Sequence, residues 1–220
     1  MKITKYDSQK KTLYYEEDNR YEKPFLDLNS PYVLNYFERV NNLVDVILKQ
    51  NYSDVPLYKV PDKYDYGKWK FRVIKSPKDG LQLVDFCSEE LKNLILDDNI
   101  PTVSWNSFEA NSDIKEHVDP PYYGKNLWRI LVPLSAEDSY ITSETLGTFK
   151  VEVGKPFILD FIYDKHSGQN KSKTVDLAFL CFDILYETDR EYTGEHFSTS
   201  TLYQKVINID MGAYERVNHD

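Results

Sequence analysis

Residues 105–134 read WNSFEANSDIKEHVDPPYYGKNLWRILVPL, and this stretch decides how the chain is interpreted. It contains a strand, a turn, the pair His117 and Asp119, an irregular loop and a second strand. A second histidine, His166, follows 49 residues after His117, shortly after the apolar run FILDFIY. Two imidazoles and one carboxylate at strand ends are the ligands of an open-sided Fe(II) site. The stretch therefore predicts a metal site built on a β-sheet.

The composition is that of a globular protein with a substantial core. The chain has 220 residues, of which 41% are hydrophobic and 15% aromatic. Its 18 tyrosines favour sheet over a helical bundle. A chain of this length buries enough surface to fold without disulfides. We expect a single domain over residues 1–220, in which residues 1–100 support a core at residues 101–210.

The charge and the termini restrict the partners and the compartment. A net charge of -9 argues against binding to nucleic acid or an anionic membrane, which requires clustered Lys and Arg. Small anionic substrates need only one or two cations and stay possible. The start, MKITKYDSQKK, lacks the apolar core of a signal peptide. Cys87 and Cys181 lie in apolar segments and are interpreted as buried thiols. We expect a cytoplasmic protein.

Two helices and several strands precede Pro101. Ser30 and Pro31 are typical of a helix start, and apolar residues recur at spacings of three and four as far as Ile47. Ser88 predicts the start of a second helix that ends near residue 98. TLYY at 12–15, KWKFRVI at 68–74 and LQLVDF at 81–86 have the residue types of strands.

Beyond Pro101 the chain carries only strand patterns. Strands at short spacing with Gly and Pro turns indicate a sandwich or barrel. The architecture is thus predicted to be mainly β, with N-terminal helices packed outside the sheets. The expected strands cover 102–109, 127–134, 147–153, 157–163, 174–186 and 201–209.

The His-x-Asp pair has more than one interpretation. His117 and Asp119 are two residues apart at a strand end, so their side chains can point to the same side. The alternative is a surface turn in which the two side chains simply pair. A zinc site or an inert cupin-like site would use the same residue types.

The segment 102–186, about 40% of the chain, resembles the double-stranded β-helix (jelly-roll, cupin-like) core of Fe(II)/2-oxoglutarate oxygenases. It is most similar to the aspartyl/asparaginyl β-hydroxylase group, which includes proline hydroxylases. Three stretches carry the resemblance: FEANSDIKEHVD at 108–119, WRILVPL at 128–134 and VEVGKPFILDFIYDKHSGQN at 151–170. Residues 1–100 have no comparable resemblance.

The resemblance implies an activity and a ligand set. His117, Asp119 and His166 would bind Fe(II), with 2-oxoglutarate and O2 as co-substrates. The reaction would hydroxylate an aliphatic C–H bond of an amino acid or of a peptidyl side chain. Asp119 itself favours hydroxylation, because the halogenating members of this superfamily carry a small residue there.

One position departs from the family pattern. The usual arginine anchor for 2-oxoglutarate, about ten residues after the distal histidine, is here Asp176. Arg129 is the expected replacement, because its guanidinium offers a planar fork to a carboxylate. Lys125, on the same strand face, and Lys173 are further candidates. Alternatively, Asp176 faces a basic substrate.

Other interpretations remain open. Arg129 could instead bind the substrate carboxylate, or form an internal ion pair with an acid such as Asp160 or Asp176. Asn106 matches a polar position that supports the co-substrate in the relatives. The expected pocket walls are aromatic: Trp105, Tyr122, Tyr123 and Trp128. Besides the oxygenase, a cupin-like isomerase, a dioxygenase without co-substrate and a non-catalytic binding module fit these features.

Overall fold

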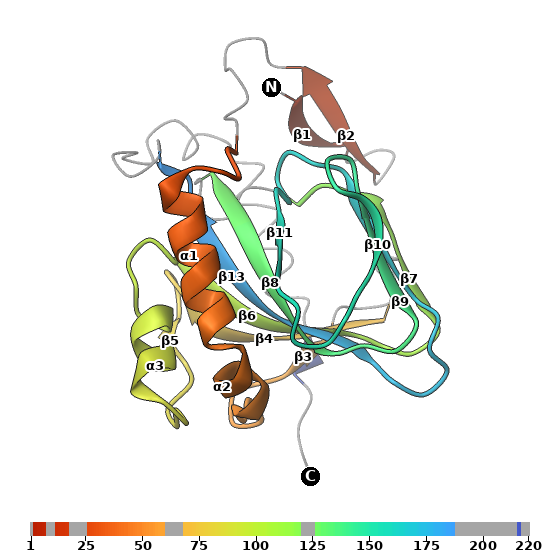
Figure 1. Ribbon diagram of the computed structural model, residues 1–220. Helices are drawn as coiled ribbons and strands as arrows, with labels where there is room; N and C mark the ends of the chain where they lie inside the picture. The colour runs from red at the N-terminus through yellow and green to blue at the C-terminus, as the bar shows by residue number, and fades with distance from the viewer. Residues whose placement is uncertain are drawn as a thin grey trace.

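Two antiparallel sheets face each other and form the body of the protein (Figure 1). The structure is a computed structural model that describes residues 26–59, 68–119 and 126–187. It also gives the backbone of residues 2–7, 12–17 and 215–216. The expected strand at 201–209 lies outside these residues.

Eight consecutive strands are divided between the two sheets, and they alternate except at β9 and β10, which form a hairpin in the small sheet. In the large sheet the order is β11-β8-β13-β6, and in the small sheet it is β10-β9-β12-β7. This interleaving is the topology of a double-stranded β-helix, so the predicted jelly roll is confirmed. The strands are β6 (Thr102–Phe108), β7 (Ser112–His117), β8 (Leu127–Ser135), β9 (Ser139–Ser143), β10 (Gly147–Lys150), β11 (Phe157–Leu159), β12 (His166–Asn170) and β13 (Leu177–Leu185).

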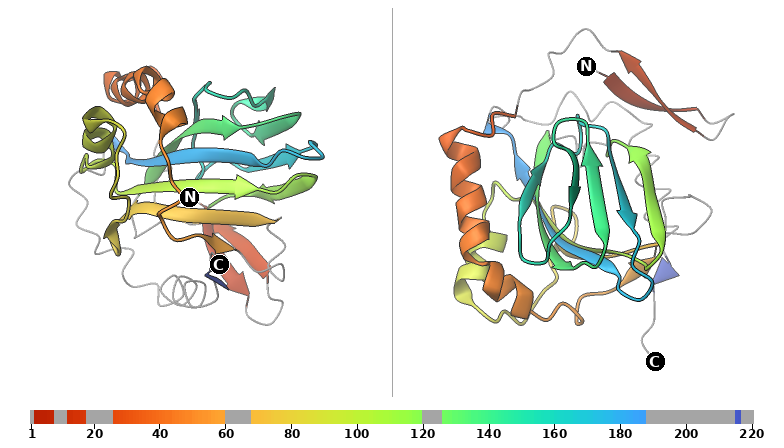
Figure 2. Two further views of the ribbon diagram at one scale, coloured as in Figure 1. Left: turned by 90° about the horizontal axis from the view of Figure 1, so that it is seen from below. Right: turned by 45° about the vertical axis from the view of Figure 1, so that its right-hand side comes forward.

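Strands from outside the jelly roll extend the large sheet beyond β6. Next to β6 lies β4 (Trp69–Ser76), followed by β3 (Tyr58–Lys59) and β14 (Glu215–Arg216). β5 (Gly80–Leu81) pairs with the end of β4. β1 (Lys2–Asp7) and β2 (Thr12–Glu17) form a separate hairpin, which includes the expected TLYY strand. Figure 2 shows the long strands of the large sheet side by side.

Three helices cover the outer face of the large sheet (Figure 1). They are α1 (Pro31–Asn42), α2 (Val44–Lys49) and α3 (Glu89–Ile95). The predicted caps are confirmed: Ser30 accepts from the Val33 amide, and Ser88 accepts from the amides at the start of α3. The apolar pattern that runs to Ile47 covers two helices rather than one. Leu43 separates them, as the C-cap of α1 and the N-cap of α2. No helix in the described residues is both long and apolar enough to cross a membrane.

The central strand β13 separates two apolar clusters. All nine of its residues are buried, because one face meets the helices and the other faces the small sheet. Leu180, Phe182 and Ile184 pack on the helix side, whereas Phe179 and Cys181 pack inside the barrel. Successive side chains of a strand point to opposite faces, so Asp183 faces the barrel interior.

Several strand boundaries differ from the sequence expectations. β7, β9 and β12 were not expected as strands, because they are short and carry polar residues. The run 157–163 is a strand only to Leu159, after which the Tyr163 and Asp164 amides bond to the Asp160 carbonyl in a turn. The run 147–153 stops at Lys150. A turn follows, in which Gly154 has a φ of 74°.

Two expectations near the N-terminal helices are wrong. LQLVDF is a strand only at Leu81; beyond it the chain is irregular and Leu83 is buried against the helices. Cys181 is buried as expected, but Cys87 is exposed in the segment before α3. The apolar context of Cys87 therefore did not indicate burial.

Asp97 joins α1 to the end of α3. Its carboxylate accepts from Arg39 at 2.8 Å, from Tyr36 at 3.1 Å and from the Asn99 amide at 2.9 Å. Burial raises the pKa of Asp97, but the bonds from Arg39 and its neighbours outweigh this and hold the pKa below its ordinary value. The carboxylate therefore stabilises the fold in its ionised form.

We predict that Asp97→Asn lowers the free energy of unfolding by about 2 kcal/mol at pH 7, because bonds to a charged acceptor are lost. Because the folded pKa is depressed, this contribution is present above about pH 4 and is lost as the pH falls further. Urea denaturation of both proteins at pH 7 and pH 3 measures it. Asp98→Asn, at the exposed neighbouring position, is the control and should leave stability unchanged.

Candidate metal centre

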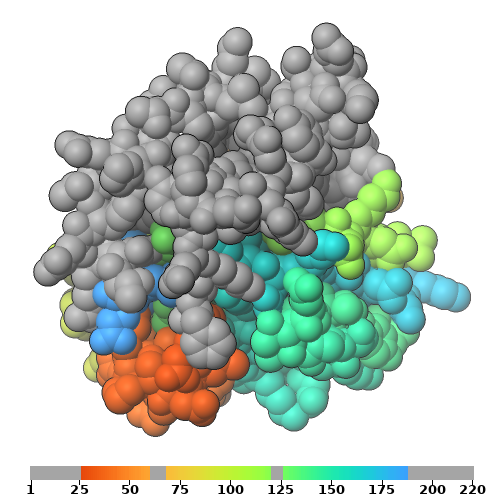
Figure 3. Space-filling model, turned by 90° about the horizontal axis from the view of Figure 1, so that it is seen from above, coloured from red at the N-terminus to blue at the C-terminus, as the bar shows by residue number. Residues whose placement is uncertain are grey.

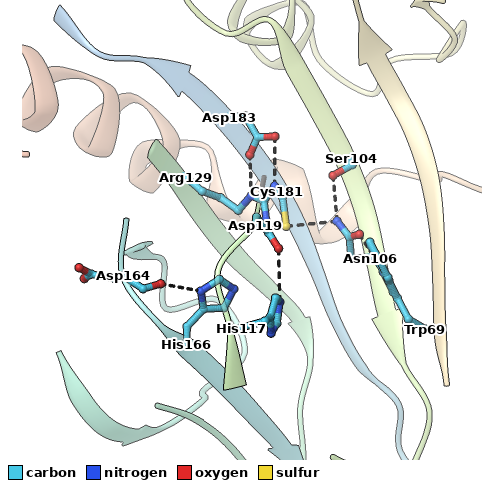
Figure 4. A network of polar contacts seen from close by, with 10 residues as sticks. All are labelled: Trp69, Ser104, Asn106, His117, Asp119, Arg129, Asp164, His166, Cys181 and Asp183. Atoms are coloured by element: carbon cyan, nitrogen blue, oxygen red, sulfur yellow. Dashed lines mark hydrogen bonds and ion pairs between the residues drawn. The ribbon is translucent and has the colours of Figure 1, made fainter. Parts of the chain in front are cut away.

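His117, Asp119 and His166 converge at one end of the barrel (Figure 4). His117 ends β7 and His166 begins β12, and the two residues are direct partners in the antiparallel ladder. Their ring centroids are 4.3 Å apart, and Asp119 Oδ1 lies 3.3 Å from His117 Nε2. The ligand atoms of all three residues lie within 4.8 Å of one another. The structure thus brings the predicted ligands together.

Backbone carbonyls set the orientation of both histidine rings. His117 Nδ1 lies 2.7 Å from the Lys115 carbonyl, and His166 Nδ1 lies 3.0 Å from the Asp164 carbonyl. A carbonyl only accepts, so Nδ1 carries the proton in each ring. Nε2 is then the atom available to a metal. This arrangement, with the second ring nitrogen held by an acceptor, is usual for metal-binding histidines.

The three groups have shifted acidities. Burial lowers the pKa of His166 to about 4, so this ring is neutral at pH 7. Burial also acts to lower the pKa of His117, but the bond and charge of Asp119 outweigh it and raise that pKa. Burial acts to raise the pKa of Asp119, yet His117 and Arg129 hold it well below its usual range. Asp119 is therefore a carboxylate under ordinary conditions.

The donor set fits a first-row transition metal. Two neutral imidazoles and one carboxylate suit Fe(II) and, with a different preferred geometry, Zn(II). The three donors come from the end of one strand, the residues after it and the start of the adjacent strand, so they approach from one side. A metal held by them would keep its other positions for small molecules.

Arg129 lies beside Asp119 and is enclosed by acids. Its Nη1 is 3.1 Å from Asp119 Oδ2, and its Nε and Nη2 are 2.5 Å and 3.1 Å from the two oxygens of Asp183. Burial acts to lower the pKa of Arg129, but these carboxylates raise it well above its ordinary value. Its guanidinium also stacks 3.9 Å from the ring centre of Phe161. Arg129 is fully charged in this setting.

These contacts correspond to one of the three roles considered for Arg129, the internal ion pair. The partners are Asp183 and Asp119 rather than Asp160 or Asp176. Asp183 is the cross-strand neighbour of Arg129, which explains why it occupies the guanidinium fork. Three of the five N–H groups of Arg129 donate in these bonds. Its role as a 2-oxoglutarate anchor stays a prediction.

Asn106 lies inside the barrel on β6 and has polar partners of its own. It accepts from Trp69 Nε1 at 3.0 Å and donates to Ser104 Oγ at 2.8 Å. Its amide also donates to Cys181 Sγ at 3.3 Å (Figure 4). These bonds connect β4, β6 and β13 across the floor of the large sheet. The predicted support of a co-substrate by Asn106 is untested.

Of the other proposed anchors, Lys125 lies outside the described residues, and Lys173 lies away from the metal end. Lys173 is exposed in the loop after β12, at the opposite end of that strand from His166, about 13 Å along it. Asp176 precedes β13 at that same opposite end, where its side chain accepts from the Ala110 amide at 3.0 Å. Asp176 thus fixes a loop, and the structure does not place it facing a substrate near the metal ligands.

The expected aromatic walls are wrong where they can be placed. Trp105 and Trp128 belong to the cluster beneath the helices and therefore face away from the barrel interior. Trp105 directly precedes Asn106, and Trp128 directly precedes Arg129. Because Asn106 and Arg129 face the barrel interior and neighbouring side chains of a strand point to opposite faces, both tryptophans face the helices. Tyr122 and Tyr123 lie outside the described residues.

Asp183 and Phe161 are the residues that sequence reasoning missed. Asp183 is 1% exposed, and it is the one charge in the otherwise apolar run LAFLCFDIL. A buried charge requires a partner, and this signal was available in the sequence. The Phe161 carbonyl accepts from the Asp119 amide at 2.8 Å, and its ring covers Arg129. No sequence signal indicated that role.

Gly168, two residues after His166, brings the small sheet close to its neighbours inside the barrel. A Cβ at this position would lie 2.9 Å from Ile114 Cδ1 and 3.1 Å from Ile141 Cδ1. The ends of the two isoleucine side chains therefore occupy the space over Gly168, and a side chain at this position would have to displace them.

A cavity of about 330 Å³ lies at the same end of the barrel. It is lined by the segment before α1, the β9–β10 turn and the β11–β12 connection, including Asp164, whose carbonyl holds His166. Figure 3 views this end, where the orange residues near α1 and the teal residues of the β9–β10 hairpin lie next to each other.

Comparisons with known proteins find similar folds among solved structures but no match at the level of sequence. No protein-family model matches the chain, and no curated protein matches its sequence. Similar solved structures are cupins. A predicted oxalate decarboxylase from Thermotoga maritima has 15% identity and a TM-score of 0.42, over 62% of this chain and 97% of that one.

Two further cupins have comparable values. Ectoine synthase from P. lautus has 14% identity and a TM-score of 0.37, over 69% of this chain and 78% of its own. The cupin domain of Schizosaccharomyces pombe Cnp3 has 12% identity and a TM-score of 0.38, over 57% and 71%. At this similarity the strand order described above, rather than any one relative, defines the fold.

We predict that His117→Ala and His166→Ala each weaken Co(II) binding at least ~100-fold, because each removes one of three protein ligands. Isothermal titration calorimetry of the purified variants measures this. His219→Ala, a histidine outside the triad, should bind as the wild type does. Wild-type affinity in either triad variant would contradict the assignment.

We also predict that Co(II) affinity falls as the pH drops below about 7. The raised pKa of His117 means that a proton competes with the metal for Nε2, whereas the lowered pKa of His166 keeps that ring neutral. Binding near pH 6.5 should therefore release more than half a proton per metal, because a His117 pKa above its ordinary value leaves most of these rings protonated at that pH. Titrations in buffers of different ionisation enthalpy count the protons, and no release at that pH would contradict the prediction.

Proposed function

We propose that this protein is an Fe(II)- and 2-oxoglutarate-dependent oxygenase that hydroxylates an aliphatic C–H bond of an amino acid or peptidyl side chain. The observation that carries the proposal is the convergence of His117, Asp119 and His166 from β7 and β12 of a jelly roll. Bound Fe(II) would supply the one-electron and O2 chemistry that side chains lack.

The chain's own residues have separate tasks in this proposal. The two Nε2 atoms and Asp119 would hold the metal, and the backbone carbonyls of Lys115 and Asp164 fix the orientation of the rings. Ile114 and Ile141 pack over Gly168, two residues after His166. The three ligands lie at one end of the barrel, and the substrate and O2 would bind at that end.

The anchor of the 2-oxoglutarate distal carboxylate is assigned mainly to Lys125. Arg129 carries one positive charge and faces two carboxylates, so the three groups together have a net negative charge that would repel a third carboxylate. Lys125 lies outside the described residues, and this assignment rests on the sequence pattern: in an extended segment, residues 125 and 129 would share a face. Lys125 would then supply the positive charge.

A second candidate is a cupin metal enzyme that uses no 2-oxoglutarate, such as an isomerase or a co-substrate-independent dioxygenase. The observation that favours it is that Asp119 and Asp183 both bind Arg129. They occupy the guanidinium that was expected to bind the carboxylate of 2-oxoglutarate. The same measurements separate the two candidates.

We predict that 2-oxoglutarate added to the anaerobic Fe(II) protein produces a visible charge-transfer band. Admitting O2 with a panel of amino acids and peptides should then yield succinate and CO2 together with a hydroxylated product. Asp119→Ala, which removes the carboxylate ligand, is the inactive control. Absence of both the band and succinate would exclude the 2-oxoglutarate proposal and leave the second candidate.

We further predict that Lys125→Met weakens 2-oxoglutarate binding by at least ~10-fold, since a hydrogen bond between charged groups contributes about 1.5–3 kcal/mol. Fe(II) affinity should be unchanged, because Lys125 is no ligand. Titration of the charge-transfer band measures both. Lys155→Met, at an exposed pair with Glu152, controls for the loss of one positive charge.

A further inference from the structure

The two carboxylate oxygens of Asp119 face different partners. Oδ1 lies 3.3 Å from His117 Nε2, on the side of the metal ligands. Oδ2 lies 3.1 Å from Arg129 Nη1, on the side of the large sheet. The backbone amide of Asp119 is also fixed by the Phe161 carbonyl at 2.8 Å. One oxygen is thus directed to the metal and the other is engaged as a hydrogen-bond acceptor.

Arg129 is held rigidly enough to control that second oxygen. Asp183 binds the Nε and Nη2 edge of the guanidinium with both of its oxygens. Phe161 lies against the guanidinium face with its ring centre 3.9 Å away. The side chain of Arg129 is only 13% exposed, and that of Asp183 is 1% exposed. Because Asp183 binds one edge of the guanidinium and Phe161 packs on its face, the rotation of the Arg129 side chain is restricted.

Asp183 is required for this arrangement by charge as well as by geometry. A buried arginine that met Asp119 alone would engage it with both arms of its fork, because bidentate pairing is the favoured geometry. Asp183 takes that bidentate position instead, as the cross-strand partner of Arg129. Asp119 is left with a single bond from the arginine, through Nη1, and its other oxygen faces His117 Nε2 on the side of the metal ligands.

We propose that Arg129 and Asp183 form a positioning pair that restricts Asp119 to one-oxygen ligation of the metal. A chelating carboxylate would occupy two coordination positions, so the pair preserves one extra position for small molecules. The inference rests on the metal site of the proposed function, and on neither 2-oxoglutarate nor turnover. It assigns Asp183 a role at the site without direct contact with the metal.

The test is Mn(II) binding to the double variant Arg129→Met/Asp183→Leu. Both charges are removed together, because one alone would leave an uncompensated charge in the barrel. Asp119 Oδ2 then loses its donor and can chelate. We expect Mn(II) affinity to change, with a loss of ~10–100-fold as is typical for outer-shell partners. Broadening of the Mn(II) electron paramagnetic resonance lines by ¹⁷O-water should count one bound water fewer than in the wild type.

A second variant protects the test against misfolding. Arg129→Lys keeps the positive charge opposite Asp183 but lacks the planar fork, so it should fold, and should also lose one water. Circular dichroism and thermal melting establish folding for each protein. If the double variant fails to fold, the Arg129→Lys water count alone decides.

The matched control removes an ion pair from the same sheet away from the metal. Lys70 on β4 and Glu109 after β6 are 3.0 Å apart, so Lys70→Met/Glu109→Gln removes one charge of each sign. This control should keep wild-type affinity and water count.

The inference would be overturned if a folded variant of the positioning pair, either Arg129→Met/Asp183→Leu or Arg129→Lys, kept the wild-type water count. This holds whether or not its Mn(II) affinity falls, because the pair would then supply only charge or stability. Since no O2 or 2-oxoglutarate is present, an inactive enzyme does not affect this outcome.

Discussion

The antiparallel pairing of β7 with β12 is the constraint on which the site depends. It places His117 opposite His166, although 49 residues separate them in the chain. Neither histidine is positioned by a loop alone, because each sits at the end of a hydrogen-bonded ladder. The jelly roll makes this pairing possible because β7 and β12, although distant in the chain, are neighbours in the small sheet.

The large sheet contributes Arg129 and Asp183 to the site, because successive side chains of its strands point to opposite faces. Leu127, Arg129 and Leu131 face the barrel interior from β8, whereas the residues between them face the helices. Asp183 faces the same interior from β13. An ion pair is thus inserted into an apolar layer, directly beside the carboxylate ligand. The low polarity around it strengthens the bonds of Arg129 and makes an unpaired charge there costly.

The sequence predicted the parts of this arrangement that have local signals. The jelly roll followed from short strands with turn residues, together with the family resemblance, and the ligands followed from His117-x-Asp119 and a distant His166. The strands β7 and β12, which carry those ligands, were not expected because they are short and polar. Cross-strand partners have no local signal, so the engagement of Arg129 by Asp183 required the register of β8 and β13. Trp128 was misassigned for a related reason: an aromatic next to an inward arginine must itself point outward.

Gly168 lies between β7 and β9 in the small sheet, where Ile114 and Ile141 are its cross-strand neighbours. The side chains of both isoleucines lie close over the glycine, two residues after His166. The same ladder between β7 and β12 pairs His166 with His117. The spacing of the two imidazoles therefore depends in part on the absence of a side chain at position 168, a residue that offers no ligand atom itself.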